Sequence, residues 1–397
     1  MNILAIETSC DETAIAIINT KEDFLHSENP QFKVLSDEVI SQIDIHAEYG
    51  GVFPAMAKRE HAKNLVPLLE HSLRQAQLWK ERDSTTSLPH ELRDILHREP
   101  ELADALEKLH QHIDTPAINM IMVTHGPGLA PALWVGVNFA RALAKLWNIP
   151  IIPVNHMEGH ISSILLKPEY KNENQALLPV SQTNFPIIAL LISGGHTQLV
   201  LVKDWCKYEI IGETIDDAVG EAFDKVARML GMPYPGGPKI STAAKKGQEN
   251  ESINLPRPMI HSGDYRFSFS GLKTAARYLI QDLEKNNQLN DQSISDIARE
   301  FEHAVTDVLI KKTSAAIQEH SAQGLIVAGG VSANIHITNH LKQLTNEFDI
   351  PLYLPERNLC GDNALMIASA GFIQYWKKQK TATISPSEIA AVANLKL

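Results

Sequence analysis

The chain has 397 residues, of which 36 are lysine or arginine and 47 are aspartate or glutamate, so its formal net charge is -11. A single hydrophobic core rarely serves more than about 300 residues, and the length therefore predicts two domains. Tight binding of nucleic acid through phosphate contacts needs a surplus of positive charge, so the acidic balance argues against that activity for this chain alone.

Cysteine content and hydropathy indicate the compartment. The three cysteines, Cys10, Cys206 and Cys360, are an odd and low number that fits a reducing environment and predicts free thiols. Glu7 interrupts the first apolar stretch and no basic residue precedes it, so we expect no secretory signal. An uncharged apolar run of about 18 residues is absent, so we expect a cytoplasmic protein without membrane association.

The first predicted elements recur later in the chain. Residues 3–17 align without gaps on residues 187–201 at a constant offset of 184 (187 minus 3), which places Ser9 on Ser193 and Thr13 on Thr197. Each segment is typical of a buried strand, a polar turn and a second strand with alternating apolar residues. Two such hairpins, each opening its own α/β half, predict a duplicated domain with a cleft between the halves. The alternative is that two unrelated hairpins look alike.

The segment from about residue 78 to 115 is charged and contains few β-branched residues. Its apolar stripe has helical spacing and is formed by Leu102, Leu106, Leu109 and Ile113. We therefore predict a peripheral helical hairpin that belongs to neither core.

Two further helices are predicted from apolar stripes. The first follows the turn Gly126-Pro127-Gly128 and carries Leu133, Val137, Ala140, Ala144 and Trp147. The second begins near Asp216 or Asp217, either of which could be its N-cap, and stops at Gly231. Residues 324–334 then predict a buried strand that runs into a Gly-Gly loop, the usual place for a ligand in α/β proteins.

Two histidines lie four residues apart in the segment His156-Met157-Glu158-Gly159-His160. Positions i and i+4 share one face of a helix, so both imidazoles could bind one divalent metal ion. In the zinc-protease signature His-Glu-x-x-His, the glutamate directly follows the first histidine and acts as general base. Here Glu158 lies about 200° around the helix from His156, so a peptidase would lack its base. The alternative is a polar loop whose two histidines have no ligand role.

Three glycine turns follow predicted strands, at residues 126–128, 193–195 and 329–330. Glycine allows backbone N–H groups to point together at an anion, so three such turns favour a ligand of the nucleotide type. Asp362 opens the last apolar helix and has two interpretations. It could be the N-cap of that helix. It could also complete a site of two histidines and one carboxylate that leaves positions open for substrate.

Several residues near these motifs invite catalytic interpretations. Cys10 lies in the first turn like a nucleophile, but Asp11 and Glu12 beside it would raise its pKa and suppress the thiolate. Asp11 and Glu12 could position an amine or a cation, or could simply be turn residues. A lone histidine is more often structural than catalytic, which is our interpretation of His61 and His196.

Nine motifs occur in order along the chain: E-T-S-C-D-E-T (7–13), G-P-G-L (126–129), N-H-M-E-G-H (155–160), S-G-G-H-T (193–197), D-D-A-V-G-E-A-F-D-K (216–225), Y-P-G-G-P (234–238), F-S-F-S-G-L-K (267–273), G-G-V-S-A-N (329–334) and G-D-N-A (361–364). Together they resemble the universal tRNA threonylcarbamoyladenosine synthase subunit, the tRNA threonylcarbamoyltransferase of bacteria, from residue 1 to about 373. The resemblance implies the duplicated actin, sugar-kinase and Hsp70-like (RNase H-like) α/β fold, with two lobes around a central cleft. Older records call members of this family glycoproteases, a label that the displaced Glu158 makes doubtful.

The resemblance also implies how the chain divides. The first lobe would span residues 1–155 and carry the peripheral insertion at about 78–115. The C-terminal helix at about 362–378 would complete that lobe. The second lobe would span residues 156–361. The insertion would make the first half longer than in typical members.

Site residues follow from the resemblance position by position. The metal ligands would be His156, His160 and Asp362, which would hold one divalent ion, iron or zinc. The strand and loop that hold the threonylcarbamoyl-adenylate would be Leu191, Ile192, Ser193, Gly194 and Gly195, while Asp224, Gly237 and Asn334 would contact its nucleoside part. At Ser241 many relatives have an acidic residue, so this chain would lack a ribose contact there. No general base is identified, and the catalytic candidates are Asp11 and Glu12.

The implied activity is transfer of the threonylcarbamoyl group from threonylcarbamoyl-AMP to the exocyclic amine of the adenosine 3′ of the anticodon, in tRNAs that read codons starting with A. Backbone donors at Ser193 to Gly195 would hold the developing negative charge. Bacterial relatives work with an inactive paralogue subunit and a small ATPase subunit, whose basic surfaces could help to hold the tRNA. Two alternatives are an ATP-binding switch or small-molecule kinase of the same fold, and a binding module that needs partners to act.

Overall fold

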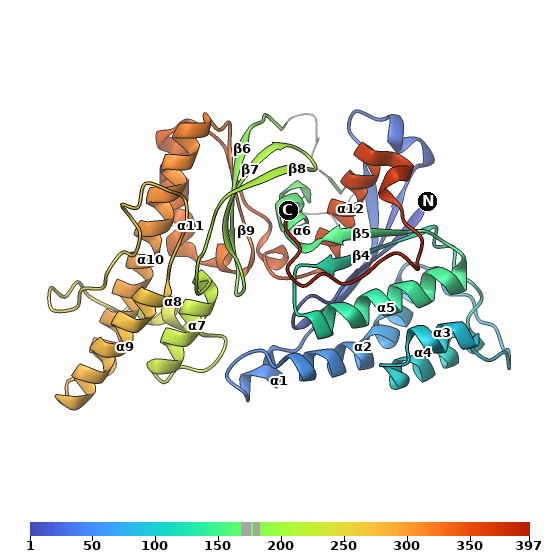
Figure 1. The fold of residues 1–397 in the computed structure, drawn as a ribbon, viewed down its shortest axis with the longest axis horizontal. Coiled ribbons are helices and arrows are strands. Elements are labelled where there is room, and N and C mark those ends of the chain that lie inside the picture. The colour runs from blue at the N-terminus through green and yellow to red at the C-terminus, as the bar shows by residue number, and fades with distance from the viewer. Residues whose placement is uncertain (168–175, 178–182) are drawn as a thin grey trace. The chain divides into compact units, whose positions relative to one another are not determined.

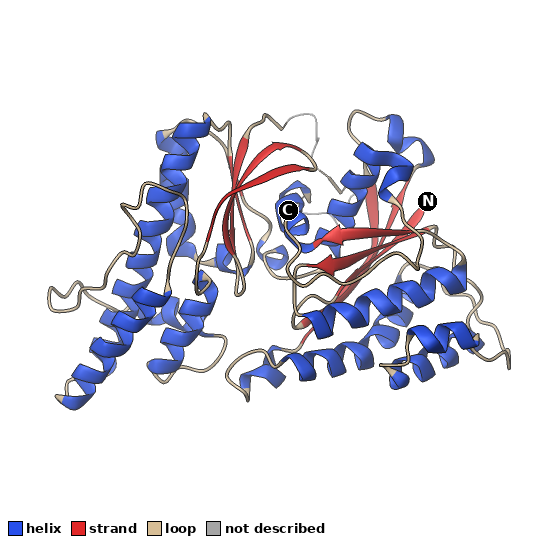
Figure 2. Cartoon of the chain, viewed as in Figure 1, coloured by secondary structure: helices blue, strands red, loops and turns tan. Residues whose placement is uncertain are grey.

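The computed structural model describes residues 1–167, 176–177 and 183–397 (Figure 1). The chain divides into two compact units. Unit 1 contains Met1–Asp44, Val52–Thr183 and Asp362–Leu397, and unit 2 contains Ile45–Gly51 and Asn184–Gly361. Each unit is built on its own mixed five-stranded sheet with helices packed against it (Figure 2).

The sheet of unit 1 has the strand order β3-β2-β1-β4-β5. Its strands are β1 (Asn2–Glu7), β2 (Glu12–Thr20), β3 (Phe32–Ser41), β4 (Met120–Gly126) and β5 (Ile151–Asn155). The first three strands are antiparallel neighbours, whereas β4 and β5 continue the sheet parallel to β1. Helices cover both faces of β1, which explains why its sequence is apolar without alternation up to Glu7.

The sheet of unit 2 repeats this path. Its strands are β6 (Ile187–Ile192), β7 (Thr197–Asp204), β8 (Lys207–Glu213), β9 (Leu325–Ala328) and β10 (Leu352–Tyr353). The order β10-β9-β6-β7-β8, read from β8, is the order of unit 1. The register is also shared, since Ile6 pairs with Ile15 and Leu190, 184 residues later, pairs with Leu199. Shared order and register confirm the predicted duplication and exclude two unrelated hairpins.

The helices of unit 1 pack on the two faces of its sheet. They are α2 (Pro54–Gln75), α3 (His90–Ile95), α4 (Pro100–His112), α5 (Ala130–Trp147), α6 (His156–Ser162) and α12 (Ala364–Lys378), with the short α1 (Ile43–Ala47) at the first passage into unit 2. α2 and α5 share a hydrophobic cluster with one face, and α12 packs with α6 on the other. α5 confirms the helix predicted after the Gly-Pro-Gly turn.

The predicted hairpin at residues 78–115 forms α3 and α4, but it is not separate from the core. Leu102, Leu106, Leu109 and Ile113 are at most 6% exposed and belong to the hydrophobic cluster of unit 1. The prediction that this hairpin belongs to neither core is therefore wrong. The physical reason is that an apolar stripe on one face of α4 is removed from water by packing on α2.

The boundary predicted after residue 155 also differs from the structure. α6 follows β5 directly and lies in unit 1, so it does not open unit 2. Met157 and Ile161 of this helix are at most 2% exposed, and the helix packs against α12. A contact between segments 200 residues apart in sequence, such as Ser162 Oγ with Met366 O, decides this assignment.

The helices of unit 2 are α7 (Val219–Met229), α8 (Gly236–Ala244), α9 (Ser270–Lys285), α10 (Asp291–His320) and α11 (Ile335–Glu347), with a 3₁₀ turn at Gly330–Ala333. α7 confirms the amphipathic helix predicted before Gly231. Its predicted N-cap is wrong, because Ala218 occupies the capping position in place of Asp216 or Asp217. Asp216 instead accepts the backbone N–H of Phe269 at 2.8 Å, at the start of α9.

Two predictions from composition can be compared with the structure. Cys10, Cys206 and Cys360 form no disulfide, as predicted. In the described part of the chain, no helix combines the length and the hydropathy that a bilayer crossing requires.

Candidate functional site

The two histidines of the predicted metal site lie on α6. Asn155, at the end of β5, caps this helix by accepting the N–H of Met157 on its side-chain oxygen at 2.8 Å. His156 and His160 project from one helix face, and their ring centroids are 4.8 Å apart. Both imidazoles are at most 5% exposed. The segment is therefore a buried helix and not a polar loop.

Asp362 lies beside both imidazoles. Its Oδ1 is 3.2 Å from Nε2 of His160 and 3.6 Å from Nε2 of His156. The N-cap of α12 is Asn363, whose side chain accepts the N–H of Met366 at 2.9 Å. The structure thus assigns capping to Asn363 and not to Asp362. One ligand atom from each of the two histidines and from Asp362 can be chosen so that all three lie within 4.8 Å of one another.

The imidazole of His160 tests whether this cluster fits a metal ion. Neither of its ring nitrogens makes a hydrogen bond to any described residue, and the side chain is 1% exposed. Nε2 of His160 lies beside the Asp362 carboxylate without forming a hydrogen bond to it, so a metal ion bound to both groups would give this buried nitrogen a partner. Two imidazole nitrogens and one carboxylate oxygen suit iron or zinc and leave coordination positions open. The residues present therefore fit a divalent ion.

Glu7, which the sequence did not single out, also reaches this cluster. Its Oε2 lies 3.2 Å from Nδ1 of His156. Burial lowers the pKa of His156, but the carboxylates of Asp362 and Glu7 outweigh burial and raise it to about 9. The sequence signal for Glu7 is an acidic residue at the end of an otherwise apolar strand, at the position where the repeat has Leu191.

Glu158, the displaced glutamate, has a different environment. It makes no hydrogen bond or ion pair with His156 or His160 among the described contacts. Burial raises the pKa of Glu158 to about 7, and the positive charge of Lys378 partly opposes this shift. The structure therefore provides no glutamate in the position of the zinc-protease base, in agreement with the sequence.

The acidic turn between β1 and β2 lies in the same unit. Burial raises the pKa of Cys10 well above its usual value, and Asp11 and Asp362 raise it further. The predicted suppression of the thiolate is confirmed, although burial is the larger cause. Burial also raises the pKa of Glu12 to about 10, with contributions from Asp362 and Asp11. This concentration of carboxylates favours a cation or an amine beside them.

The two lone histidines hold turns in place. His61 of α2 contacts the hydroxyl of Thr13 through Nδ1 at 2.8 Å and the carbonyl oxygen of Cys10 through Nε2 at 3.0 Å. The backbone N–H of His196 donates to the hydroxyl of Ser193 at 3.1 Å. The side-chain contacts of His61 agree with the structural role predicted for it, whereas the backbone contact of His196 does not test the role of its imidazole.

The first of the three predicted glycine turns is covered. The N–H of Gly128 donates to the carbonyl oxygen of Ala393 at 3.1 Å. A Cβ added to Gly126 would lie 2.0 Å from the carbonyl oxygen of Val392. The C-terminal segment therefore occupies the space in which this turn could have received an anion.

The turn at residues 193–195 is open. The N–H of Ser193 donates to the carbonyl oxygen of His196 at 2.9 Å, so only two of the three predicted backbone donors remain. The N–H groups of Gly194 and Gly195 donate to no described residue. A Cβ added to either glycine would meet no atom within 4 Å, and the same is true of Gly330. The Cβ side of the turn is therefore open, whereas the nitrogen of Gly194 packs near Gly220 of α7, where an added Cβ would lie 2.9 Å from it. Backbone N–H groups beside open space suit an anionic ligand.

All the predicted substrate residues lie in unit 2, whereas the metal cluster lies in unit 1. The side chains of Leu191 and Ile192 are at most 1% exposed in β6, so only their backbone could contact a ligand. Asp224 accepts the N–H of Gly236 at 2.7 Å and thereby holds the start of α8. Gly237, the next residue, faces open space.

Asn334 is part of a network with Ser241 and Glu302. Its amide nitrogen donates to Oγ of Ser241 at 3.0 Å and to Oε1 of Glu302 at 2.8 Å. Its oxygen accepts the N–H of Ile337 at 3.1 Å and so caps α11. Ser241 in turn donates to Glu302, which is 4% exposed. Glu302 was not predicted from the sequence, and it places a carboxylate beside Ser241.

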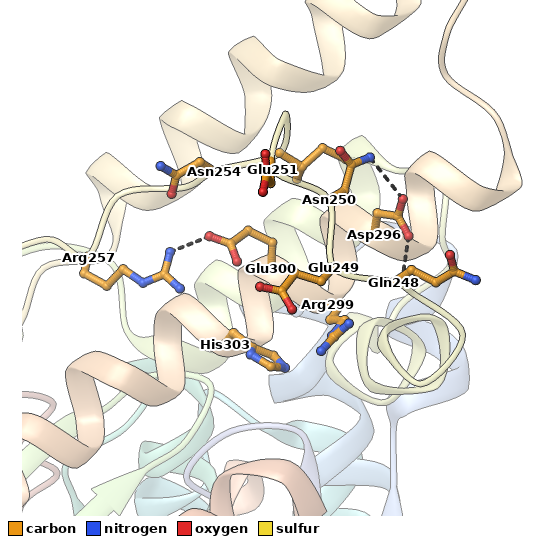
Figure 3. Close-up of a pocket in the computed structure, with 11 residues that line it drawn as sticks. Gln248, Glu249, Asn250, Glu251, Asn254, Arg257, Asp296, Arg299, Glu300 and His303 are labelled. Atoms are coloured by element: carbon orange, nitrogen blue, oxygen red, sulfur yellow. Dashed lines mark hydrogen bonds and ion pairs between the residues drawn. The ribbon is translucent and has the colours of Figure 1, made fainter.

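Figure 3 shows a pocket of unit 2 with a volume of about 550 Å³. It is lined by Gln248, Glu249, Asn250, Glu251, Ile253, Asn254, Arg257, Asp296, Arg299, Glu300 and His303. Asp296 accepts the N–H of Gln248 at 2.8 Å, and Arg257 forms an ion pair with Glu300. Much of its charge is thus paired within the lining, and no predicted site residue lines it.

The chain is similar to known proteins over most of its length. The family model of tRNA N6-adenosine threonylcarbamoyltransferase matches residues 33–83 and 97–369, and the unmatched residues between them lie in the predicted insertion. A relative with that name from Thermosipho africanus (strain TCF52B) is 38% identical over 100% of both chains. Relatives with the same name from Chromobacterium violaceum and Dichelobacter nodosus are 40% and 42% identical, covering 94% and 93% of this chain and 92% and 90% of theirs.

The similarity to solved structures is lower than the similarity to these relatives. Full-length HypF in its phosphate- and nucleotide-bound form aligns with a TM-score of 0.47 at 13% identity, over 71% of this chain and 42% of that chain. This likeness is too low to support an argument. The family model and the relatives agree with the resemblance carried by the nine ordered motifs. The chain belongs to the tRNA N6-adenosine threonylcarbamoyltransferase family.

Proposed function

We propose that this chain transfers the threonylcarbamoyl group of threonylcarbamoyl-AMP to the exocyclic amine of the adenosine 3′ of the anticodon, in tRNAs that read codons starting with A. The amine attacks the carbamoyl carbon, the bond from that carbon to the phosphate oxygen breaks, and AMP leaves. The observation that carries the proposal is the cluster of His156, His160 and Asp362 in a chain of this family. An ATP-binding switch or small-molecule kinase needs no such cluster, so the alternative is not favoured.

His156, His160 and Asp362 are the proposed ligands of one divalent ion, iron or zinc. When bound, the ion would act as a Lewis acid on the acyl or threonyl oxygens of the donor. The helix cap at Asn155 and the burial of both imidazoles fix the directions of the ligand atoms before substrate arrives. Such preorganisation lowers the entropic part of the barrier.

The open glycine turn is the proposed site for the anionic part of the donor. The N–H groups of Gly194 and Gly195 would stabilise negative charge on the phosphate or on the reacting oxygen. Asp224, Gly237 and Asn334 are the proposed contacts to the nucleoside. Asn334 also donates to Ser241 and Glu302, so it would orient these two side chains in addition to contacting the nucleoside.

Little further chemistry is required of the protein. The donor is an activated mixed anhydride, so holding the amine against it removes much of the barrier without a covalent enzyme intermediate. Asp11 and Glu12 are the side chains that we propose to position the incoming amine. The high pKa of Cys10 supports leaving its thiol out of the reaction.

Partner subunits are also part of the proposal. The chain carries a net charge of -11, so we propose that an inactive paralogue subunit and a small ATPase subunit contribute basic surface for the tRNA. We propose the cytoplasm as the site of action, where its tRNA substrate is found. Adding such partners to the purified chain should raise activity, and full activity of the chain alone would contradict the dependence on partners.

A direct test uses the purified chain with partners, a tRNA transcript, threonylcarbamoyl-AMP, and Zn²⁺ or Fe²⁺. Nucleosides from the digested tRNA are quantified by mass spectrometry, and bound metal is measured in the same samples. His156→Ala should lose both metal and product. His90→Ala, which removes an exposed histidine on α3, is the matched control and should retain both. If His156→Ala bound metal and modified tRNA as well as the unaltered protein, the proposal would be wrong.

A further inference from the structure

Glu7 is a fully buried acidic residue at the end of β1. It is 0% exposed, as are Ile3, Leu4, Ala5 and Ile6 before it. A carboxylate in such surroundings is costly unless donors surround it. The groups that contact the Glu7 carboxylate therefore indicate its role.

Three groups face the carboxylate of Glu7. The backbone N–H of Ser9 donates to Oε1, and the hydroxyl of Thr124 donates to Oε2. Nδ1 of His156 lies 3.2 Å from the same Oε2. An ionised carboxylate only accepts hydrogen bonds, so Nδ1 of His156 must carry the proton in this contact. Nε2 is then the nitrogen that faces Asp362 and that could give up its proton to bind a metal ion.

The second half of the chain shows that the fold does not require this acid. The repeat aligns Glu7 with Leu191, which is the next-to-last residue of β6, lies in the same register and is 1% exposed. A leucine at this point is enough to build the hairpin, and it avoids the cost of burying a charge. The acid occurs only in the half that also carries His156 and His160.

We propose that Glu7 is a positioning residue that fixes the tautomer and the ring orientation of His156 for metal coordination through Nε2. Metal-binding histidines usually donate their second N–H to a carboxylate or carbonyl, and loss of that partner weakens metal binding. Thr124 and the N–H of Ser9 hold the carboxylate in place. The inference rests on the metal centre of the proposed function.

The test compares metal affinity among variants of the full chain. Dissociation constants for Zn²⁺ are measured by competition with a chelator, for the unaltered protein, Glu7→Gln, Glu158→Gln and His156→Ala. Glu7→Gln should weaken Zn²⁺ binding about 10- to 100-fold, because the amide cannot serve all three donors as an acceptor. Glu158→Gln removes a carboxylate from the histidine helix without any contact to the imidazoles, so it should bind Zn²⁺ as the unaltered protein does.

The outcomes separate this inference from the proposed function. If the unaltered protein and His156→Ala bind Zn²⁺ equally, the metal centre itself fails. If His156→Ala loses Zn²⁺ but Glu7→Gln keeps full affinity, only the role of Glu7 is refuted. If Glu158→Gln weakens binding as much as Glu7→Gln, general charge and not positioning explains the effect, and the inference also fails.

A second measurement covers the case in which Glu7→Gln does not fold. Nitrogen chemical shifts of ¹⁵N-histidine in the Zn²⁺-loaded protein distinguish the two tautomers, and His156→Ala identifies the signals of His156. The proposal predicts a protonated Nδ1 and a metal-bound Nε2. Coordination through Nδ1 would overturn it.

Discussion

The hairpin that opens unit 1 and the hairpin that opens unit 2 have the same register but different turns. Between the aligned pairs Ser9/Ser193 and Thr13/Thr197, unit 1 has Cys-Asp-Glu and unit 2 has Gly-Gly-His. Carboxylates attract a cation or an amine, whereas glycine N–H groups attract an anion. Duplication therefore accounts for the common scaffold, and the turn residues make the two copies chemically different, one acidic and one rich in glycine.

What the two hairpins share is structural. Thr13 and Thr197 are both 0% exposed. Thr13 contacts His61 on α2 at 2.8 Å, and Thr197 accepts the N–H of Val219, the first residue of α7, at 2.8 Å. The threonine after the turn thus joins the hairpin to α2 in unit 1 and to α7 in unit 2.

The largest expected effect is the loss of metal binding in unit 1, with unit 2 left unchanged. Asp362→Ala should weaken Zn²⁺ binding by more than about 100-fold, because it removes the charged ligand and not only an outer partner. Metal content and hydrogen exchange measure the effect. Zn²⁺ should protect α6 in the unaltered protein and not in the variant, while α7 exchanges equally in both. Asp282→Ala, an exposed change on α9, serves as control, and protection of α6 in Asp362→Ala would contradict the assignment.

A second change gives unit 2 the turn chemistry of unit 1. Gly195→Asp places a carboxylate at the position aligned with Asp11, beside the proposed anion site. We expect AMP binding, measured by calorimetry, to weaken by more than about tenfold because of charge repulsion. Gly195→Ala should weaken it less, and thermal stability should be kept, since an added Cβ meets no atom within 4 Å. Equal AMP affinity in Gly195→Asp would argue that this turn binds no anion.

A third test concerns the feature that the two hairpins share, the buried threonine after each turn. Thr13→Val and Thr197→Val each remove one buried hydrogen bond between the hairpin and a helix, which costs about 0.5–1.5 kcal/mol. Urea unfolding of both variants should therefore show a similar loss of stability. A loss in only one of them would show that the two threonines do not have equivalent roles.

A smaller effect is expected at Asp216, which has no counterpart role in unit 1. Partial burial raises its pKa, but hydrogen bonds from Ser268, Ser270 and the N–H of Phe269 lower the pKa overall. Asp216→Ala should cost about 1 kcal/mol, the usual cost of removing a capping side chain. The pKa of Asp216 is lower in the folded protein than in the unfolded chain. Its contribution to the free energy of unfolding is therefore fully present above the unfolded-state pKa, and it is lost as the pH falls through the folded-state pKa. The stability difference between the two proteins should therefore shrink in acid, which unfolding at several pH values would check.

The smallest effect is expected at the turn of unit 1. Cys10→Ser should leave tRNA modification unchanged, because burial and Asp11 keep the thiol protonated. The assay is product formation at several pH values. Loss of activity with a pH profile that follows a thiol would assign Cys10 a chemical role after all.

The sequence by itself determined the elements that depend on local pattern. The duplication, the helix after the Gly-Pro-Gly turn, the amphipathic helix before Gly231 and the nine ordered motifs all follow from spacing and composition. The pair His156 and His160 also belongs here, because i and i+4 positions meet on any helix. Family membership followed from the motifs before any coordinates were needed.

Only the tertiary structure decided which distant residues meet. Asp362 reaches the histidines because α12 packs on α6, and Asn363 rather than Asp362 caps the helix. The same is true of the contacts made by Glu7, by Glu302 and by Asp216 at the start of α9. Each joins segments far apart in the chain, and a local sequence pattern cannot predict such contacts. The C-terminal segment over Gly126 and the burial of α4 on α2 have the same origin. Local spacing determines which face a side chain takes, but long-range packing determines what that face meets.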